Sequence, residues 1–382
     1  MQEASRTRIC FVGLNNLAVL APEYDRSGPA GEPVQHTLLA RSLARRGYDV
    51  SMVTGDFGQP DGKVWDGVKT FKAYSLEAGL PVLRFVHPRW TGLLSALGRA
   101  NADVYYSSCA GGLAGQVAMF CAWHGKRYVF RLASDSDCMP DALIIKHWYW
   151  RDQRLYRYAL SHAAGVLAQS KRQQELLWRN FQVRSSIARM MIGAPGANAE
   201  FAARDVDALW VSNLRRLKRP DILLGVASEL PQLAFHMVGG AVRSDPGFFE
   251  ELRSQVRRTA NVTFHGALPY DETSALYGRA RVFVNSSEME GFPNTYLQSW
   301  ASGTPVVAFF DPDGLIAKHG LGAAVRTQAE MRGAIRILSR DEAAWRAARA
   351  RCLAFIERSY GEDATLQQYL QVLDPARGVC ET

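Results

Sequence analysis

The sequence predicts an α/β fold made of two doubly wound domains, each with a parallel sheet covered by helices. Short apolar runs of four to six residues, without polar alternation, are separated by longer helical stretches. Such runs are typical of strands that are covered on both faces. The alternation of strand and helix runs through the chain twice, which indicates two sheets built from strand–helix units.

The alternation restarts after residues 192–206, a segment rich in Gly, Ala and Pro that we interpret as a linker. We therefore expect an N-terminal domain over residues 1–198, a second domain over residues 206–360, and a C-terminal helix and tail over residues 361–382 that packs back on the N-terminal domain. Ligands of such folds bind at the carboxyl ends of the strands, so two domains facing each other would form one central cleft. The expected strands are Ile9–Val12, Val50–Val53, Val104–Tyr106, Tyr128–Leu132, Gly165–Ala168, Leu209–Ser212, Leu233–Val238, Val262–His265, Val282–Asn285 and Pro305–Phe309.

The composition is that of an ordinary globular chain. Of 382 residues, 47 % are apolar and 21 % charged, which argues against disorder, collagen and coiled coil. Lys and Arg outnumber Asp and Glu by 45 to 37, a net charge of +8 that suits an anionic partner without choosing among phosphate, nucleic acid and lipid. No signature of a nucleic-acid-binding fold is present, so we expect no nucleic-acid partner.

The cysteines and apolar runs predict a cytoplasmic protein. The six cysteines are scattered, without a C-x-x-C pair, so we expect neither a metal site nor a disulfide framework. No apolar run approaches the roughly 18 residues of a spanning helix, and Ile9–Val12 is interpreted as a strand rather than a leader peptide. Lys146–Leu160 mixes bases with aromatics. It either contacts an anionic membrane surface or forms a helix that buries its aromatics and solvates its arginines.

The stretch Ser287–Ala308 carries the most informative pattern. It follows the strand Val282–Asn285 with a turn that contains Glu290, and then with a helix over residues 294–302 whose first turn includes Pro293. A helix N-terminus at the carboxyl end of a strand attracts phosphate through its free N–H groups and its dipole.

The polar residues around this N-terminus suit a sugar ligand. Asn294 and Thr295 lie in the first turn, and Glu290 lies just outside it. Gln298 is one turn further along, on the same helix face as Asn294. A carboxylate and an amide together accept and donate the hydrogen bonds that sugar hydroxyls make.

This stretch resembles the nucleotide-sugar signature of the retaining GT-B glycosyltransferases of glycosyltransferase family 4, S-x-x-E-G-F-G-x-x-x-x-E-A-x-A-x-G-x-P-V-V. The residues in register are Ser287, Glu290, Gly291, Phe292, Ala301, Gly303, Pro305, Val306 and Val307. Pro293 replaces a common Gly, and Gln298 replaces the second Glu. The resemblance implies that Glu290 contacts the donor sugar, that Gln298 contacts the ribose without charge, and that Gly291 and Phe292 belong to the donor site.

Three further segments of the second domain resemble the same family. Leu209–Lys218 resembles a strand followed by G-R-L-x-x-x-K-G, which implies that Lys218 binds the donor diphosphate. Asn213 stands where the family has Arg, so Arg215 or Arg216 would supply the missing charge; the alternative is a solvated basic loop. Met237–Gly240 and Val262–Gly266 resemble elements of the donor site, the second near its base pocket. The residues they imply there are Gly239 and His265.

The first domain matches more loosely. Gly28–Gly31 and the helix that ends near Arg46–Val50 resemble the family's Gly-rich opening, and Gly31 would let the loop approach the leaving phosphate. Where the family often carries a His, this chain has Ser134 to Asp137, which leaves Asp135 or Asp137 to bind or polarise the acceptor. The string D-x-D also raises the alternative of a metal-dependent GT-A enzyme. Such an enzyme would not carry the second α/β domain.

The resemblance implies a GT-B fold with two Rossmann-like domains facing a central cleft. It implies an enzyme that transfers a sugar from a nucleoside diphosphate sugar to an acceptor hydroxyl, with retention, without metal or other cofactor. The implied catalytic residues are Glu290, Lys218 and Asp135. The expected acceptor is a glycan or a lipid-linked molecule of surface polysaccharide or glycoconjugate synthesis, at the inner face of a membrane. The departures at Ser134, Asn213 and Gln298 leave the alternative of an impaired protein that binds sugar nucleotides or acts as a scaffold.

Overall fold

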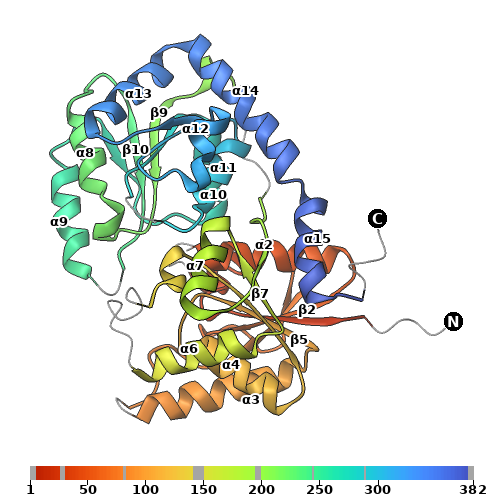
Figure 1. The fold of residues 1–382 in the computed structure, drawn as a ribbon. Helices are drawn as coiled ribbons and strands as arrows, with labels where there is room; N and C mark the ends of the chain where they lie inside the picture. Colours follow the sequence, from red (N-terminus) through yellow and green to blue (C-terminus); the bar gives the residue numbers. More distant parts are fainter. Residues whose placement is uncertain are drawn as a thin grey trace. The chain divides into compact units, whose positions relative to one another are not determined.

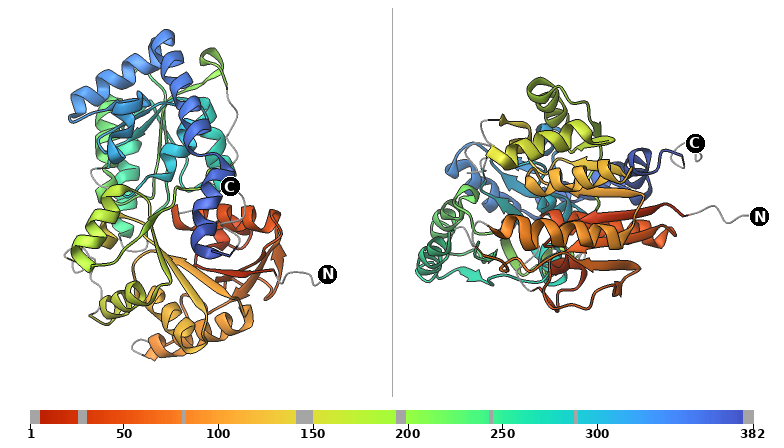
Figure 2. Two further views of the ribbon diagram at one scale, coloured as in Figure 1. Left: turned by 45° about the vertical axis from the view of Figure 1, so that its right-hand side comes forward. Right: turned by 90° about the horizontal axis from the view of Figure 1, so that it is seen from below.

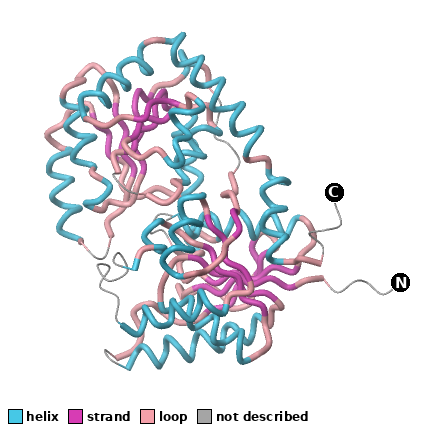
Figure 3. The backbone as a smooth tube through the Cα atoms, viewed as in Figure 1, coloured by secondary structure: helices cyan, strands magenta, loops and turns pink. Residues whose placement is uncertain are grey.

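A computed structural model describes residues 6–25, 31–80, 83–140, 150–193, 199–242, 245–287 and 290–376 of the chain. The described residues form two compact units. Unit 1 contains the described residues up to Met191 together with those from Glu362 onward, and unit 2 contains residues 192–361. Each unit has a largely parallel sheet with helices around it, which confirms the predicted α/β fold class (Figure 3).

Unit 1 contains an eight-stranded sheet in the order β3-β4-β2-β1-β5-β6-β7-β8. Only the pairing of β3 with β4 is antiparallel among the described pairs. Because β1 lies between β2 and β5, the chain leaves β1 toward one side and later returns on the other. The strands are β1 Arg8–Val12, β2 Asp49–Thr54, β3 Val64–Trp65, β4 Val68–Lys72, β5 Val104–Ser108, β6 Arg127–Arg131, β7 Gly165–Ala168 and β8 Ser186–Ile187.

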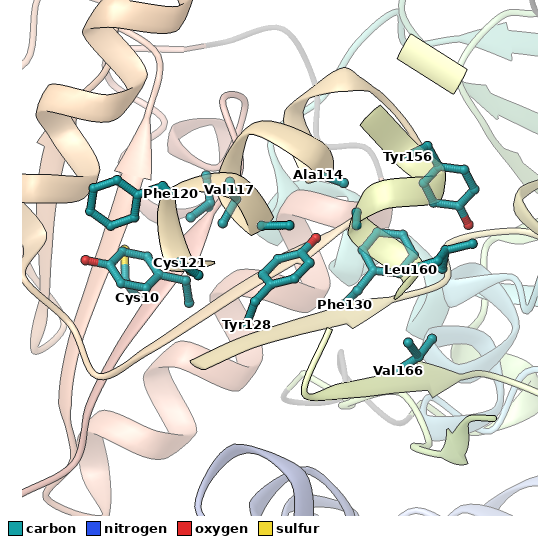
Figure 4. Packing of buried hydrophobic residues seen from close by; sticks show 14 of the residues in the cluster. Cys10, Ala114, Val117, Phe120, Cys121, Tyr128, Phe130, Tyr156, Leu160 and Val166 are labelled. Carbon is teal, nitrogen blue, oxygen red and sulfur yellow. The ribbon is translucent and has the colours of Figure 1, made fainter. Parts of the chain in front are cut away.

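Helices cover both faces of the unit 1 sheet (Figure 1). On one face α3 (Thr91–Ala100), α4 (Gly112–Trp123), α6 (Trp150–His162) and α7 (Lys171–Phe181) bury apolar side chains against the strands. Figure 4 shows this core, in which Tyr128 and Phe130 lie among side chains of α4 and α6. The remaining short elements of unit 1 are α1 Leu17–Leu20, η1 Leu83–Phe85, η2 Val86–Trp90 and η3 Asp135–Cys138.

The other face is covered by α2 (Gly31–Arg45) and by the C-terminal helix α15 (Glu362–Leu373). Tyr369 of α15 is buried in this second core. Ser42 Oγ on α2 donates a hydrogen bond to Glu362 Oε1 at 2.6 Å. The C-terminal helix is thus part of unit 1 although it follows unit 2 in the sequence.

Unit 2 contains a six-stranded sheet in the order β11-β10-β9-β12-β13-β14, in which all described pairs are parallel. The chain passes from β9 outward to β11 and then returns to β12 on the other side of β9. The strands are β9 Val206–Val211, β10 Phe235–Val238, β11 Val262–Phe264, β12 Ala280–Asn285, β13 Val306–Ala308 and β14 Gly322–Ala324. Two further views show the helices around this sheet (Figure 2). They are α8 Pro220–Ser228, α9 Pro246–Val256, α10 Tyr270–Arg279, α11 Asn294–Ala301, α12 Leu315–His319, α13 Gln328–Arg340 and α14 Glu342–Ser359, with short η4 Phe201–Ala203, η5 Arg216–Lys218 and η6 Pro312–Gly314.

The expected linker contributes a buried side chain to unit 2. Arg204 is 1 % exposed, and its guanidinium donates to the carbonyl oxygens of Ala199 (2.9 Å) and Ser302 (2.8 Å). It also donates to the carbonyl oxygen of Ala280 and to Thr304 Oγ1, both at 2.5 Å. Burial lowers the pKa of Arg204 to about 10. The side chain ties the entry of unit 2 to the start of β12 and to the segment after α11.

Among the described helices none is long and apolar enough to cross a bilayer. Five cysteines are free thiols, and four of them are buried. Cys380 lies outside the described residues.

Candidate functional site

The side chains of Lys218 and Glu290 meet at the carboxyl edge of the unit 2 sheet. Lys218 ends η5, which follows β9, and Glu290 lies between β12 and α11. β9 and β12 are neighbours in the sheet, at the point where the strand order reverses. In doubly wound sheets this switch point is where ligands bind. Lys218 Nζ lies 2.5 Å from Glu290 Oε1, with side chains only 17 % and 14 % exposed.

A second layer of hydrogen bonds holds the loops that carry these two residues. Trp210 Nε1 on β9 donates to Ser286 Oγ at 3.0 Å, and Ser286 Oγ donates to the Lys218 carbonyl at 2.7 Å. Asn285 Nδ2, at the end of β12, approaches Glu290 Oε1 to 3.5 Å. The backbone of η5 is thereby fastened to the end of β12.

The helix after Glu290 begins at Asn294, as predicted. Pro293 does not belong to its first turn, because its ψ of 119° is extended; it is the N-cap residue, and α11 begins at Asn294. The helix is anchored by Tyr296, whose hydroxyl donates to the Phe310 carbonyl at 2.8 Å, and by Trp300, whose Nε1 donates to the Leu321 carbonyl at 3.1 Å. Its N-terminus is therefore fixed beside Glu290, and the first N–H groups of a helix lack intrahelical acceptors.

The remaining residues predicted on this segment lie on both sides of the helix start. Asn294, Thr295, Gln298 and Gly291 are half-buried. Phe292 is buried, and its ring packs toward Tyr360 with ring centres 6.2 Å apart. The sequence signature therefore includes one residue that contributes to the core of unit 2. Of this stretch, residues 288 and 289 lie outside the described residues.

The two arginines of the basic loop after β9 differ in their partners. Arg216 donates to Asp245 Oδ2 at 3.0 Å and to Glu251 Oε2 at 3.1 Å, so two carboxylates already compensate its charge. Arg215 is exposed and makes no ion pair with the part of the chain that the structure describes. Asn213 is half-buried in the same loop. Arg215 is thus the arginine whose charge is available to a ligand.

Gly239 and His265 follow the neighbouring strands. A Cβ atom on Gly239 would lie 2.2 Å from the Ser212 carbonyl oxygen, so only glycine allows the loops after β9 and β10 to approach this closely. His265 Nε2 lies 3.0 Å from His236 Nδ1. Burial is the main cause that lowers the pKa of both histidines. The role of His265 in a base pocket stays a prediction.

The residues predicted in unit 1 are placed differently. Asp135 is buried, and its carboxylate accepts from Arg172 Nε at 3.0 Å and Gln173 Nε2 at 3.2 Å, both on α7. Asp137 accepts from the backbone N–H groups of Ala133 and Ser134. Both carboxylates thus have structural partners, and a catalytic role of Asp135 stays a prediction. Gly31 is the first residue of α2, and Gly28 lies outside the described residues.

Sequence reasoning missed Glu32, in the first turn of α2. Its carboxylate lies at the switch point of the unit 1 sheet, against Ser108 and Cys109 at the end of β5. The signal that could have found it is its place directly after the Gly-rich segment that follows the first strand. Within the described ranges, no group of three or more His, Cys, Asp or Glu side chains could hold a metal ion.

Comparison with known families assigns both halves of the chain. Residues 31–193 match the model of the "Glycosyl transferase 4-like domain", and residues 205–341 match that of "Glycosyl transferases group 1". The chain belongs to glycosyltransferase family 4. The matched residues 205–341 include both Lys218 and Glu290, the two side chains that meet at the edge of the unit 2 sheet.

Individual proteins resemble this family 4 chain over different lengths. The alpha-monoglucosyldiacylglycerol synthase of Streptococcus pneumoniae is 33 % identical over 99 residues, which is 25 % of this chain and 22 % of the synthase. The chain thus spans less than a quarter of the length of that relative. Sucrose-phosphate synthase from Thermosynechococcus elongatus superimposes with a TM-score of 0.77 at 19 % identity, over 97 % of this chain and 99 % of that one. The Anabaena protein HepE, in complex with UDP and glucose, gives a TM-score of 0.72 at 15 % identity, over 97 % and 100 %. These structural likenesses establish the GT-B fold.

Proposed function

We propose that this family 4 protein transfers a sugar from a nucleoside diphosphate sugar to the hydroxyl group of an acceptor. The observation that carries the proposal is the meeting of Lys218 and Glu290 at the switch point of unit 2, beside the start of α11. A cation, a carboxylate and free helix N–H groups are the three partners that a diphosphate joined to a sugar requires. HepE, a structural neighbour, was determined with UDP and glucose.

The chemistry assigned to this chain is charge stabilisation. As the bond between the anomeric carbon and the diphosphate oxygen breaks, negative charge develops on the diphosphate. Lys218 and the N-terminus of α11 would stabilise that charge, with Arg215 nearby on the loop after β9. Glu290 would accept hydrogen bonds from the sugar hydroxyls and orient the ring. These groups supply positive charge from the protein itself, which supports a reaction without metal or other cofactor.

The ion pair has a consequence for donor binding. Lys218 Nζ donates a hydrogen bond to Glu290 Oε1, so a diphosphate that binds Lys218 would compete with this carboxylate for the ammonium group. The released carboxylate is then free to accept the sugar hydroxyls. Binding of the diphosphate and orientation of the sugar are in this way coupled through one contact.

Retention of the anomeric configuration and a place in surface polysaccharide or glycoconjugate synthesis complete the proposal. Both rest on the resemblance to family 4. We also propose a lipid-linked or glycan acceptor and peripheral contact with an anionic membrane. The pneumococcal relative is by name an alpha-monoglucosyldiacylglycerol synthase, and this name supports the choice of a lipid acceptor.

One surface of unit 1 supports membrane contact. Leu83, Val86 and Trp150 are 61 %, 60 % and 68 % exposed. The guanidinium of Arg151 lies over the ring of Phe85 at 3.4 Å, which brings the start of α6 to η1. Exposed apolar side chains among arginines suit an anionic lipid surface. Within Lys146–Leu160, Tyr156 is buried, which favours the interpretation as a helix that packs its aromatics inward. Trp150 is exposed, which supports the proposed membrane contact; residues 146–149 lie outside the described residues.

Turnover of nucleotide sugars by matched variants tests the proposal. Lys218→Ala and Glu290→Ala should each lower the transfer rate at least tenfold, a loss of about 1.4 kcal/mol of transition-state stabilisation. Arg332→Ala removes the ion pair to Glu229 on the surface of unit 2 and should leave the rate unchanged. Equal rates in all four proteins would refute the assignment of the site.

The alternative is a protein that binds sugar nucleotides without transferring the sugar. The substitutions at Asn213 and Gln298, relative to the family signature, favour it. Calorimetry separates the two functions. A donor that binds but is not consumed with any supplied acceptor would establish the binding protein.

A further inference from the structure

Two consecutive residues at the end of β12 contact the two charged residues of the unit 2 site. Asn285 Nδ2 approaches Glu290 Oε1 to 3.5 Å, and Ser286 Oγ donates to the Lys218 carbonyl oxygen at 2.7 Å. The contact from Asn285 reaches a charged side chain directly. The bond from Ser286 acts instead on the main chain of η5, and not on the ammonium group of Lys218. Any effect of this hydroxyl on the ammonium group therefore passes through the position of the main chain.

The direction of the hydrogen bonds at Ser286 is fixed by its two partners. Trp210 Nε1 lies 3.0 Å from Ser286 Oγ, and an indole N–H can only donate. The Lys218 carbonyl oxygen can only accept, so the hydroxyl proton of Ser286 points at it. A directed chain of hydrogen bonds thus runs from Trp210 through Ser286 to Lys218. Trp210 and Ser286 are only 2 % and 0 % exposed.

This chain of hydrogen bonds connects η5 to the core of unit 2. Trp210 stands on β9 and belongs to the apolar core that also contains Leu223 of α8 and Val284 of β12. η5 has three residues and buries none of them, and its large apolar side chain, Leu217, is 52 % exposed. Apolar packing therefore does little to hold this turn in place. The bond from Ser286 supplies a link between the turn and the buried core.

The residue after Lys218 gives the orientation of this carbonyl a further importance. Arg219 has a φ of +50° and a ψ of +50°, a left-handed conformation that is costly for a residue with a side chain. The Lys218 carbonyl belongs to the peptide group between these two residues. A rotation of that peptide group would change the ψ angle of Lys218 and the φ angle of Arg219 together, and would allow Arg219 a negative φ. The bond from Ser286 opposes this rotation.

We propose that Ser286 is a positioning residue for the donor diphosphate, because it fixes the main chain from which the Lys218 ammonium group reaches the ligand. The inference rests on the proposed function and adds a residue that acts through Lys218. A lysine carries its charge on a flexible four-carbon stem, so an anchored main chain limits where the charge can go. When a diphosphate takes the ammonium group from Glu290, this anchor keeps Lys218 at the site.

A double-mutant cycle on nucleoside diphosphate binding tests this proposal. Calorimetry uses UDP, GDP or ADP, whichever the wild type binds. Ser286→Ala should weaken this binding about three- to tenfold, the range expected for the loss of one hydrogen bond. In the Lys218→Ala background the same change should have no further effect, since the ammonium group is absent. Equal weakening in both backgrounds would overturn the inference, and so would wild-type affinity of Ser286→Ala.

Ser339→Ala is the matched control. Ser339 on α13 is also 0 % exposed, and its Oγ donates to the Ile335 carbonyl oxygen at 2.7 Å. This variant loses a buried hydroxyl of the same kind, away from the site, and should bind the nucleotide as the wild type does. A merely structural role of Ser286 would lower the fraction of folded protein and leave the dissociation constant of the folded molecules unchanged. The affinity therefore separates positioning from stability.

Ser286→Cys gives the second variant if Ser286→Ala fails to fold, because it keeps a side chain of similar size. A thiol is a weak donor, so Ser286→Cys should also weaken binding, and again only when Lys218 is present. Wild-type affinity of this variant would overturn the inference. In turnover, kcat/KM for the donor should fall by the same factor while KM for the acceptor stays unchanged.

The same measurements separate this inference from the proposed function. A wild type that binds no nucleoside diphosphate would refute the proposed function. Binding that depends on Lys218 but not on Ser286 would overturn this inference alone.

Discussion

Lys218 Nζ and Glu290 Oε1 lie 2.5 Å apart although the residues are 72 positions apart in the sequence. By the resemblance to family 4, Lys218 contacts the donor diphosphate and Glu290 the donor sugar. Without a donor, these two side chains form an ion pair with each other at one edge of the unit 2 sheet. Replacing Glu290 with Gln removes the competitor for Lys218. We predict that Glu290→Gln binds a nucleoside diphosphate at least as tightly as the wild type and transfers sugar at least tenfold more slowly. Calorimetry and turnover measure the two effects, and weaker binding together with unchanged turnover would contradict the coupling.

Gly239 is required by the close approach of the loops after β9 and β10. A Cβ atom there would lie 2.2 Å from a backbone oxygen, so Gly239→Ala should lower the free energy of unfolding by about 1–3 kcal/mol. Gly333→Ala on α13 is the control, because its Cβ meets nothing within 4 Å, and alanine should stabilise the helix by about 0.5–1 kcal/mol. Urea denaturation measures both. Equal stability of the two variants would show that the loops relax freely.

Arg204 should be among the most sensitive positions of unit 2. Arg204→Met leaves two buried backbone carbonyls and Thr304 without the guanidinium donor, and we expect a loss of about 3 kcal/mol or more. Arg340→Met removes an exposed hydrogen bond to the Gln232 carbonyl and a long ion pair of 3.9 Å to Asp207, which keeps its closer partner Arg281, and it should cost less than about 1 kcal/mol. A small effect of Arg204→Met in chemical unfolding would mean that the segment before β9 is not tied to unit 2.

The stability of the chain should depend on pH through Glu32. Its pKa of about 7 in the folded chain exceeds the ordinary value of 4.5. The contribution of Glu32 to the free energy of unfolding is therefore fully present below pH 4.5 and is lost as the pH rises through 7. Between these values, as the pH falls, the wild type should gain up to about 1.4 kcal/mol per pH unit relative to Glu32→Gln.

His36 should act with the opposite sign. Its pKa is lowered to about 3 from 6.5, so its contribution is present above pH 6.5 and is lost as the pH falls. As the pH falls below about 6.5, the free energy of unfolding of the wild type should decrease relative to that of His36→Gln. Over the same range it should increase relative to that of Glu32→Gln. Urea titrations at a series of pH values give both differences. If the stability of all three proteins changed with pH in the same way, the opposite pKa shifts of Glu32 and His36 would be contradicted.

The apolar surface around η1, η2 and α6 predicts membrane binding. The double variant Leu83→Ser, Val86→Ser should float with anionic liposomes at least several-fold less than the wild type at physiological salt. Val64→Ser on β3 also removes an exposed apolar side chain, outside that surface, and should float as the wild type does. A wild type that stays at the bottom of the gradient would exclude this surface as a membrane contact.

Most strands that sequence reasoning found are buried on both faces; the edge strand β11, with its exposed Thr263, is an exception. β4 was missed because its residues V-K-T-F-K include an exposed Lys69 between buried ones, so it is not a continuous apolar run. β14 was missed because Gly322–Ala324 has no large side chains. Gly322 packs so closely on β13 that a Cβ would lie 1.9 Å from the Val306 oxygen. The edge strand β14 is therefore defined by the close approach of its backbone to β13, which a pattern of apolar residues does not record.

The candidate site was predictable to different depths in the two units. In unit 2 a contiguous signature named Glu290, and the strand order then brought Lys218 to it. In unit 1 the sequence emphasised Asp135, whose carboxylate is engaged by α7. For Glu32 the sequence offers only its place directly after the Gly-rich segment, because its partner Ser108 is 76 residues away and only the fold brings the two together.

The most direct test of the account is the binding of nucleoside diphosphates to the wild type and to Lys218→Ala, measured by calorimetry with UDP, GDP and ADP. The account predicts that the wild type binds at least one of them, and that loss of the lysine weakens this binding at least tenfold, as expected for a charge-assisted contact of about 1.5–3 kcal/mol. Equal affinity of the two proteins for every nucleotide would contradict the claim that Lys218 holds the diphosphate.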